Sequence, residues 1–207
     1  MDDVLAATAA FITTLSELHP TEQARRDPLD KPLGIALGMP FSQILNRDLT
    51  VCDGTMTTTP GFPIIESVAF LFREDKREAG DGGCDPTIQA GLSAARFWTH
   101  DDVSISPTHS FSCLIVIIIV VQHAIVRNNT CYPTFLLENA GPWLAVLGFV
   151  FADKLVCQHL TDFIWVGFDS VLNERHSVCV ARILHAFGRN LRKLKEYYEH
   201  LSYRKYI

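Results

Sequence analysis

The feature that most constrains this sequence is a short strand pattern that is apolar on both faces and ends in charged residues. Its core, Val68-Ala69-Phe70-Leu71-Phe72, contains no polar position, although the side chains of a strand alternate between the two faces of a sheet. Such a strand needs apolar cover on both sides, which is typical of a central strand in an α/β protein. The charged residues Glu74, Asp75 and Lys76 then fall at the end of a buried strand.

The patterns on both sides of this segment agree with an α/β fold. Apolar residues at helical spacing predict a helix over 2–18, and Asp85-Pro86 supplies a cap and a first turn for a helix that runs to about Trp98. Residues 20–34 are polar and contain three prolines, so we expect a loop there, and 33–43 is expected to be irregular. Further candidate strands are 49–52, 66–76, 135–138, 144–151 and, as a strand or a short helix, 156–166, with Asp53-Gly54 read as a turn and 55–63 as a loop.

The C-terminal part of the chain is strongly helical. Over 176–201 the apolar residues follow alternating steps of four and three: Val180, Leu184, Phe187, Leu191, Leu194, Tyr198 and Leu201. This stripe either packs on the sheet or forms a coiled-coil seam with a partner or a second copy, although Gly188 weakens an isolated helix. The basic residues of this helix either bind phosphate or form a solvated face: Arg182, Arg189, Arg192, Lys193 and Lys195.

The segment 103–126 stands apart from the rest of the pattern. Residues 114–121 are all aliphatic and mostly β-branched. This run is short for a membrane span, which needs about 20 apolar residues. The alternatives are a buried strand, a membrane or interfacial segment, and an apolar insert that does not belong to the ancestral fold.

Length and composition favour one domain over residues 1–207. Nearly half of the residues are hydrophobic, and the net charge of −5 gives no global attraction to nucleic acid. The six cysteines match no zinc framework, and the N-terminus carries no secretory pattern. We therefore expect reduced thiols in a cytoplasmic or nuclear protein, with membrane association disfavoured.

A candidate catalytic site follows from the strand ends. Glu74 and Lys76 lie two residues apart and so share a face of their strand. Asp53 ends the preceding candidate strand, so pairing of the two strands would bring Asp53 and Glu74 together at one edge. Two carboxylates suit Mg²⁺ or Mn²⁺, and a neighbouring lysine can orient a water or stabilise negative charge. The alternative is that these are ordinary solvated charges at a strand end.

Three other polar residues bear on this site. Gln89 lies in the helix after Lys76 and is either a fourth site residue that touches the water, the phosphate or the metal shell, or a polar surface residue. Asp75 points to the opposite face from Glu74, where we expect it to be solvated. Asp48 is a rival for the first carboxylate.

Several ordered motifs carry a resemblance to a known family. They are Asn46-Arg47-Asp48, Val51-Cys52-Asp53-Gly54, Glu74-Asp75-Lys76-Arg77-Glu78, Gly80, Gly82-Gly83-Cys84-Asp85-Pro86, Gln89-Ala90, Ala140-Gly141-Pro142-Trp143, Gly148, Phe151, Asp153, Gln158, Leu160-Thr161-Asp162 and Ile164-Trp165. Together they resemble the domain that precedes the kinase in fungal-type protein kinases of basidiomycetes, and related restriction-endonuclease-like domains of Crinkler-type effectors. The resemblance covers roughly 35–100 and 127–200, and 111–126 has no counterpart in it.

The resemblance implies a PD-(D/E)XK nuclease-like fold, in which helices flank a mixed central sheet and a long C-terminal helix follows. It implies that Asp53 and Glu74 hold Mg²⁺ or Mn²⁺, that Lys76 positions a water, and that Gln89 supports them. The chain itself has no glycine-rich nucleotide loop and no HRD or DFG motif, so it is not a kinase. Two functions remain open: phosphodiester hydrolysis of DNA or RNA, and a non-catalytic module that binds a protein or regulates an associated kinase.

Overall fold

Strand β2 (Ala69–Lys76) is buried along its whole length, as its two-sided apolar pattern predicts. In the computed structural model it lies between β1 (Gly54–Thr57), which is antiparallel to it, and β3 (Thr134–Ala140), which is parallel to it. Helix α3 (Pro86–Thr99) connects the two parallel strands, as a crossover between parallel strands requires. The structure describes residues 2–42, 53–58, 68–76, 86–99, 131–151, 154–167 and 173–203.

The described strands form one mixed, open sheet of six strands in the order β1-β2-β3-β4-β5. Strand β4 (Trp143–Phe151) is antiparallel to β3, and its far side pairs with both β5 (Leu155–His159) and β6 (Ile164–Trp165). The expected segment 156–166 is therefore two short strands. The turn Gly141-Pro142 joins β3 to β4 in a hairpin, and Gly141 takes a positive φ of 59° there.

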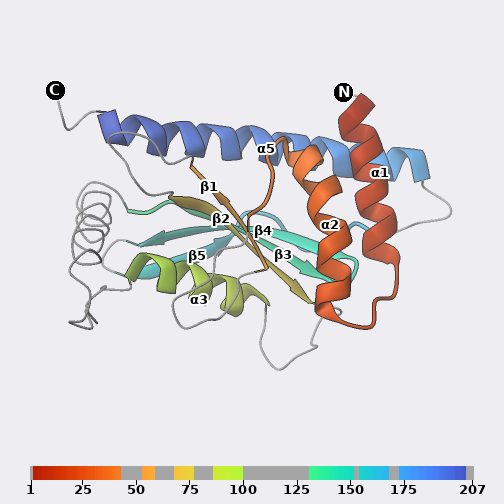
Figure 1. Ribbon diagram of the computed structural model, residues 1–207, viewed down its shortest axis with the longest axis horizontal. Coiled ribbons are helices and arrows are strands. Elements are labelled where there is room, and N and C mark those ends of the chain that lie inside the picture. The colour runs from red at the N-terminus through yellow and green to blue at the C-terminus, as the bar shows by residue number, and fades with distance from the viewer. Residues whose placement is uncertain are drawn as a thin grey trace, which may run out of the picture.

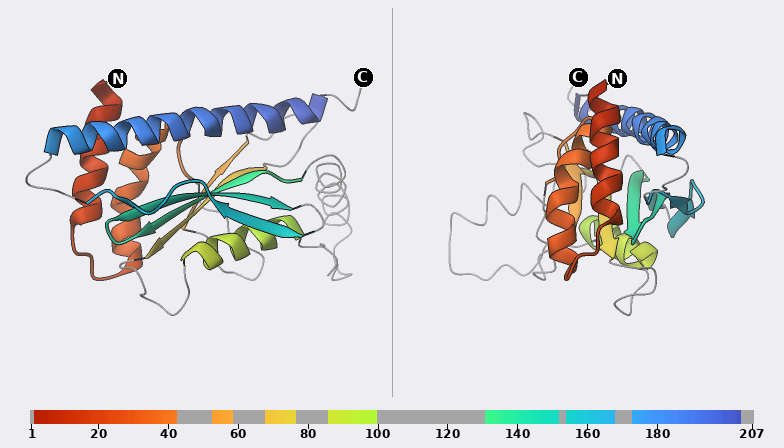
Figure 2. Two further views of the ribbon diagram at one scale, coloured as in Figure 1. Left: turned by 180° about the vertical axis from the view of Figure 1, so that it is seen from behind. Right: turned by 90° about the vertical axis from the view of Figure 1, so that its right-hand side faces the viewer.

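Helices cover both faces of the sheet. Helix α3 lies against one face, and the long helix α5 (Asn173–Tyr203) lies across the other (Figure 1). Helices α1 (Asp2–Ser16) and α2 (Glu22–Leu37) stand side by side and cross the N-terminal half of α5 (Figures 1 and 2). The stripe of α5 is buried in this packing from Val180 to Tyr198, which agrees with its interpretation as a packing face.

Helix α2 corrects the expectation of a loop over 20–34 and of irregular structure after it. Its N-cap is Thr21, whose side chain accepts a hydrogen bond from the Ala24 amide at 3.1 Å, and Gly38 ends it with a φ of 77°. Pro28 lies on the exposed side of the helix, where water can satisfy the carbonyl that a proline leaves without a donor. Four apolar side chains on the opposite side are buried: Leu29, Leu33, Ala36 and Leu37. This packing outweighs the local preference of the two prolines.

Strand β1 begins one residue after Asp53, where a turn and a loop were expected. Gly54 is a strand residue, and its lack of a side chain leaves room for its neighbours. A Cβ at this position would come within 3.0 Å of the Phe41 ring and 3.3 Å of the Arg73 side chain. A glycine is therefore needed here because other side chains pack closely against the strand, and not because the chain turns.

Some expectations concern residues that the structure does not describe. The candidate strand 49–52, the apolar segment 103–126, Asp48 and Asp85 all lie outside the described residues. Within the described residues, no helix combines the length and the apolar character that crossing a membrane requires. Cys131, Cys157 and Cys179 are described, and all three are exposed free thiols.

Candidate functional site

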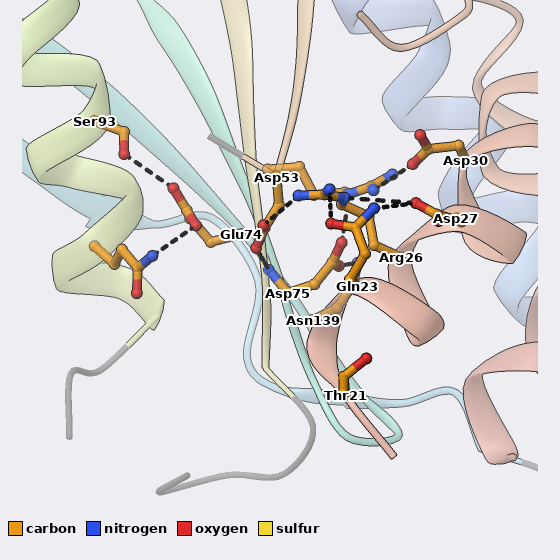
Figure 3. A network of polar contacts seen from close by, with 12 residues as sticks. Thr21, Gln23, Arg26, Asp27, Asp30, Asp53, Glu74, Asp75, Ser93 and Asn139 are labelled. Atoms are coloured by element: carbon orange, nitrogen blue, oxygen red, sulfur yellow. Dashed lines mark hydrogen bonds and ion pairs between the residues drawn. The ribbon is translucent and has the colours of Figure 1, made fainter. Parts of the chain in front are cut away.

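The pairing of β1 with β2 brings Asp53 opposite Glu74. Gly54 is in register with Arg73, so the preceding residue of β1 faces the following residue of β2. The carboxyl groups of Asp53 and Glu74 lie within hydrogen-bonding reach of each other. Figure 3 shows the pair with α3 on one side and α2 on the other. This is the meeting of carboxylates that strand pairing predicts for the two residues.

Glu74 is held on the α3 side by neutral donors. The Gln89 side-chain amide donates to one carboxyl oxygen at 3.0 Å, and the Ser93 hydroxyl donates to the other at 2.9 Å. Burial, followed by the charge of Asp53, raises the pKa of Glu74 to about 8. Because no cation offsets its charge among these contacts, Glu74 retains a proton at neutral pH. Gln89 thus contacts Glu74 directly, as the prediction of a fourth residue at this position requires.

Asp53 is held on the other side by charged and backbone donors. One carboxylate oxygen accepts from Arg26 of α2 at 2.9 Å, and the other accepts from the backbone amide of Asp75 at 2.8 Å. Burial, with the charge of Asp75 next, raises the pKa of Asp53 despite these contacts. Arg26 also donates to the side-chain oxygen of Gln23, so α2 fixes the guanidinium from its own first turns.

Lys76 lies two residues beyond Glu74 and on the same face of β2, as predicted. Its side chain is almost fully buried, with 7% of the residue exposed. Its backbone carbonyl accepts hydrogen bonds from the Gly141 amide at 2.9 Å and from the Arg25 guanidinium. The end of β2 is therefore fixed from both α2 and the β3–β4 hairpin, which sets where the lysine can lie.

Asp75 is buried, with 1% of its surface exposed, and the expectation that it is solvated is wrong. It pairs with Arg73 at 2.9 Å and accepts a hydrogen bond from Asn139 of β3 at 2.6 Å. Arg73 in turn pairs with Asp30 of α2. Helix α2 covers this face of the sheet, and the missed helix is the reason that the burial of Asp75 was missed.

Glu138 is a further buried carboxylate on the face that carries Glu74. The two residues are partners in the parallel pairing of β2 with β3. Glu138 is fully buried and accepts a hydrogen bond from the Thr87 hydroxyl at 2.9 Å. The sequence pattern that could have identified Glu138 is the apolar run Phe135-Leu136-Leu137, which Glu138 follows directly. Glu74 likewise follows the apolar run of β2 closely.

The arrangement can be compared with the needs of a divalent metal ion. No group of three or more His, Cys, Asp or Glu side chains in the described part of the chain is placed to hold one. Asp53 and Glu74 nevertheless form a close pair of carboxyl groups, and Mg²⁺ often uses only one or two carboxylates, with water and substrate phosphate as its other ligands. The pair fits such an ion, provided that Arg26 gives way at Asp53.

The chain was compared with protein-family models, with curated proteins and with solved structures, and no match was found in any of the three.

Proposed function

We propose that this chain is a metal-dependent nuclease-like domain of the PD-(D/E)XK kind, which hydrolyses phosphodiester bonds of DNA or RNA. The observation that carries the proposal is the pairing of Asp53 with Glu74, with Gln89 on Glu74 and Lys76 on the same face of β2. The order β1, β2, crossover helix α3 and parallel β3 supports the same organisation.

Each residue has a distinct role in this proposal. Asp53 and Glu74 are the ligands of Mg²⁺ or Mn²⁺, and Gln89 and Ser93 hold the Glu74 carboxylate in a fixed orientation. A divalent ion bound there would neutralise phosphate charge and lower the pKa of a bound water. Lys76 stabilises the negative charge that develops on the phosphate, or orients the attacking water.

A cleavage assay tests this function. Single- and double-stranded DNA and RNA are incubated with wild-type protein and Mg²⁺ or Mn²⁺, and with the variants Glu74→Gln and Lys76→Met. The exposed residues Glu196 and Lys193 of α5 offer matched controls, Glu196→Gln and Lys193→Met. We expect metal-dependent cutting that both site variants abolish and both controls retain. Cutting that survives Glu74→Gln would place the site elsewhere.

A second function is favoured by one observation, the ion pair of Arg26 with Asp53. A protein cation already neutralises the first carboxylate, as expected in a domain that keeps the fold without the chemistry. The chain would then be a non-catalytic module that binds a protein partner or regulates an associated kinase. Failure of folded wild-type protein to cut any of the four substrates with either metal would favour this function.

A further inference from the structure

An exposed group of aromatic rings lies along the outer strands of the sheet. Trp143 of β4 and Trp165 of β6 remain 37% and 42% exposed, and their rings meet edge to face with centroids 5.0 Å apart. Phe163, 47% exposed, lies beside the ring of His159 of β5 at 5.9 Å. We call these four residues the aromatic platform. Exposing four rings together is unfavourable in water, so the group calls for an explanation.

Strand register connects the platform to the carboxylate site. Lys76 pairs with Ala140, Ala140 with Trp143, and Trp143 with Trp165, so one row crosses β2, β3, β4 and β6. Residues in such a row project from the same face of a sheet. Trp143 and Trp165 therefore lie on the face that carries Glu74 and Lys76. With strands ~4.8 Å apart, Trp143 is roughly 10 Å from Lys76 along the row.

The position of Trp165 is fixed although its ring is exposed. A Cβ on Gly167 would come within 2.8 Å of both the Trp165 ring and Pro142, so the ring rests closely against the glycine. The Trp143 ring supports it from the other side. An indole held in this way loses little conformational entropy when a flat ligand stacks on it.

From this row we infer that the aromatic platform is a stacking subsite for the unpaired bases of a single-stranded nucleic acid, whose phosphate backbone crosses the Asp53–Glu74 site. The inference rests on the proposed function and names its substrate class. Exposed rings beside a phosphate-binding site are the usual means of holding unpaired bases, whereas bases in a duplex are already stacked on one another. Stacking also suits a chain of net charge −5, which has no overall electrostatic attraction for a polyanion.

Binding in the absence of cutting tests this inference. A fluorescein-labelled single-stranded oligonucleotide is titrated into the protein with EDTA present, and anisotropy is compared for wild type, Trp143→Ala and Trp165→Ala. We expect each variant to bind about 5- to 150-fold more weakly, the contribution of one stacked base. Two of the chain's three tryptophans belong to the platform, and Trp98 is buried, so the intrinsic fluorescence of wild type should fall on binding.

Two controls isolate stacking from other causes. Tyr197 on α5 is as exposed as Trp165, at 42%, but its aromatic contact is with Tyr198 and not with a residue of the platform, so Tyr197→Ala should bind like wild type. An abasic oligonucleotide keeps the phosphates and lacks the bases, so it should bind all variants equally weakly. Equal binding of the ordinary oligonucleotide by wild type and both tryptophan variants would overturn the inference, as would tight binding of the abasic one.

The outcomes separate this inference from the proposed function. Tryptophan-dependent binding without metal-dependent cutting would support the subsite and reject the nuclease. Cutting of duplex with no affinity for single strands would support the nuclease and reject the subsite. Absence of binding to every nucleic acid, with the platform variants weakening binding of a protein instead, would also reject the subsite.

Discussion

Glu74 and Asp75 are adjacent residues of one strand, and both are essentially fully buried, yet they face opposite sides of the sheet and meet opposite kinds of partner. Asp75 faces α2, where it pairs with Arg73 and accepts a hydrogen bond from Asn139. Glu74 faces α3, where its hydrogen-bond donors among the described residues are the neutral groups of Gln89 and Ser93, and where the carboxyl group of Asp53 is its neighbour.

The difference separates a carboxylate whose charge is paired inside the fold from one whose described donors are neutral. Although burial alone would lower it, the pKa of Arg73 is raised by the charges of Asp75 and Asp30, so the cation persists inside the protein. The charge of Asp75 is thus compensated within the fold. No such cation lies among the described contacts of Glu74, and burial favours its protonated form. Asp53 interacts with both residues. Its carboxylate accepts a hydrogen bond from the backbone amide of Asp75, and its charge raises the pKa of Glu74.

The largest effect should come from the α2 face. Replacing Arg73 by methionine leaves Asp75 buried without its cation, and we expect the free energy of unfolding to fall by about 3–5 kcal/mol. Urea denaturation at pH 7 measures the loss. The exposed Arg189 of α5 serves as control, and Arg189→Met should change stability by less than about 0.5 kcal/mol. A loss as small as that of the control would show that the buried network does not support the fold.

On the α3 face, Glu74→Gln should change how stability depends on pH. Since the pKa of Glu74 rises from 4.5 to about 8 on folding, the native state binds its proton more tightly than the unfolded state. The carboxyl therefore contributes its full stability below pH 4.5, and that contribution is lost as the pH rises to about 8. Glutamine does not titrate in this range. Between pH 4.5 and about 8, the unfolding free energy of wild type should therefore fall by a few kcal/mol relative to that of Glu74→Gln. Parallel pH profiles would contradict the raised pKa.

The helices on the two faces should also differ in tolerance to a methyl group. A Cβ on Gly188 of α5 would collide with the main-chain carbonyl of Leu37 in α2, whereas a Cβ on Gly91 of α3 meets nothing within 4 Å. We expect Gly188→Ala to lower the unfolding free energy by about 1–3 kcal/mol. Gly91→Ala should raise it by about 0.5–1 kcal/mol, because alanine favours the helix. Thermal or urea unfolding of both variants measures the two changes in unfolding free energy. Equal changes would contradict the closer packing around Gly188 than around Gly91.

The remaining effect concerns metal affinity and the residue that pairs with Asp53. Arg26→Gln removes the cation from its carboxylate, so Mn²⁺ should bind about tenfold more tightly, equivalent to ~1.4 kcal/mol. Calorimetry or electron paramagnetic resonance measures this affinity without any substrate. Arg182→Gln, at an exposed position of α5, is the matched control. Unchanged or weaker binding in Arg26→Gln would mean that Arg26 does not oppose the metal.

Local patterns in the sequence were sufficient to predict most of the α3 side of this comparison. Strand alternation places Glu74 and Lys76 on one face. The meeting of Asp53 with Glu74 was also expected, but the strand that pairs with β2 is Gly54–Thr57, where a turn and a loop were expected, and the candidate strand 49–52 lies outside the described residues. Ser93 was missed, although it lies one helical turn beyond Gln89 on the same side of α3. Glu138 was missed because its proximity to Glu74 depends on a parallel pairing between strands that are distant in sequence.

The α2 side could not be predicted in the same way. Pro28 and Pro32 led to the expectation of a loop in place of α2. Without the helix, there was no reason to place Arg25 and Arg26 near the end of β2. The contacts that bury Asp75 join residues from α2, β2 and β3, and no periodicity within one segment encodes them. A polar residue at a strand end reads as solvated until the element that covers it is known.

Glu74 is expected to carry a proton that a metal ion can displace, and a titration of its carboxyl group checks this expectation. Carbon-13 NMR of side-chain carboxyls, with Glu74→Gln to assign the signal, gives the midpoint with and without Mg²⁺. We expect a midpoint near pH 8 without metal and a clearly lower one with Mg²⁺, because the ion competes with the proton. A midpoint near the ordinary 4.5 that Mg²⁺ leaves unchanged would contradict the account.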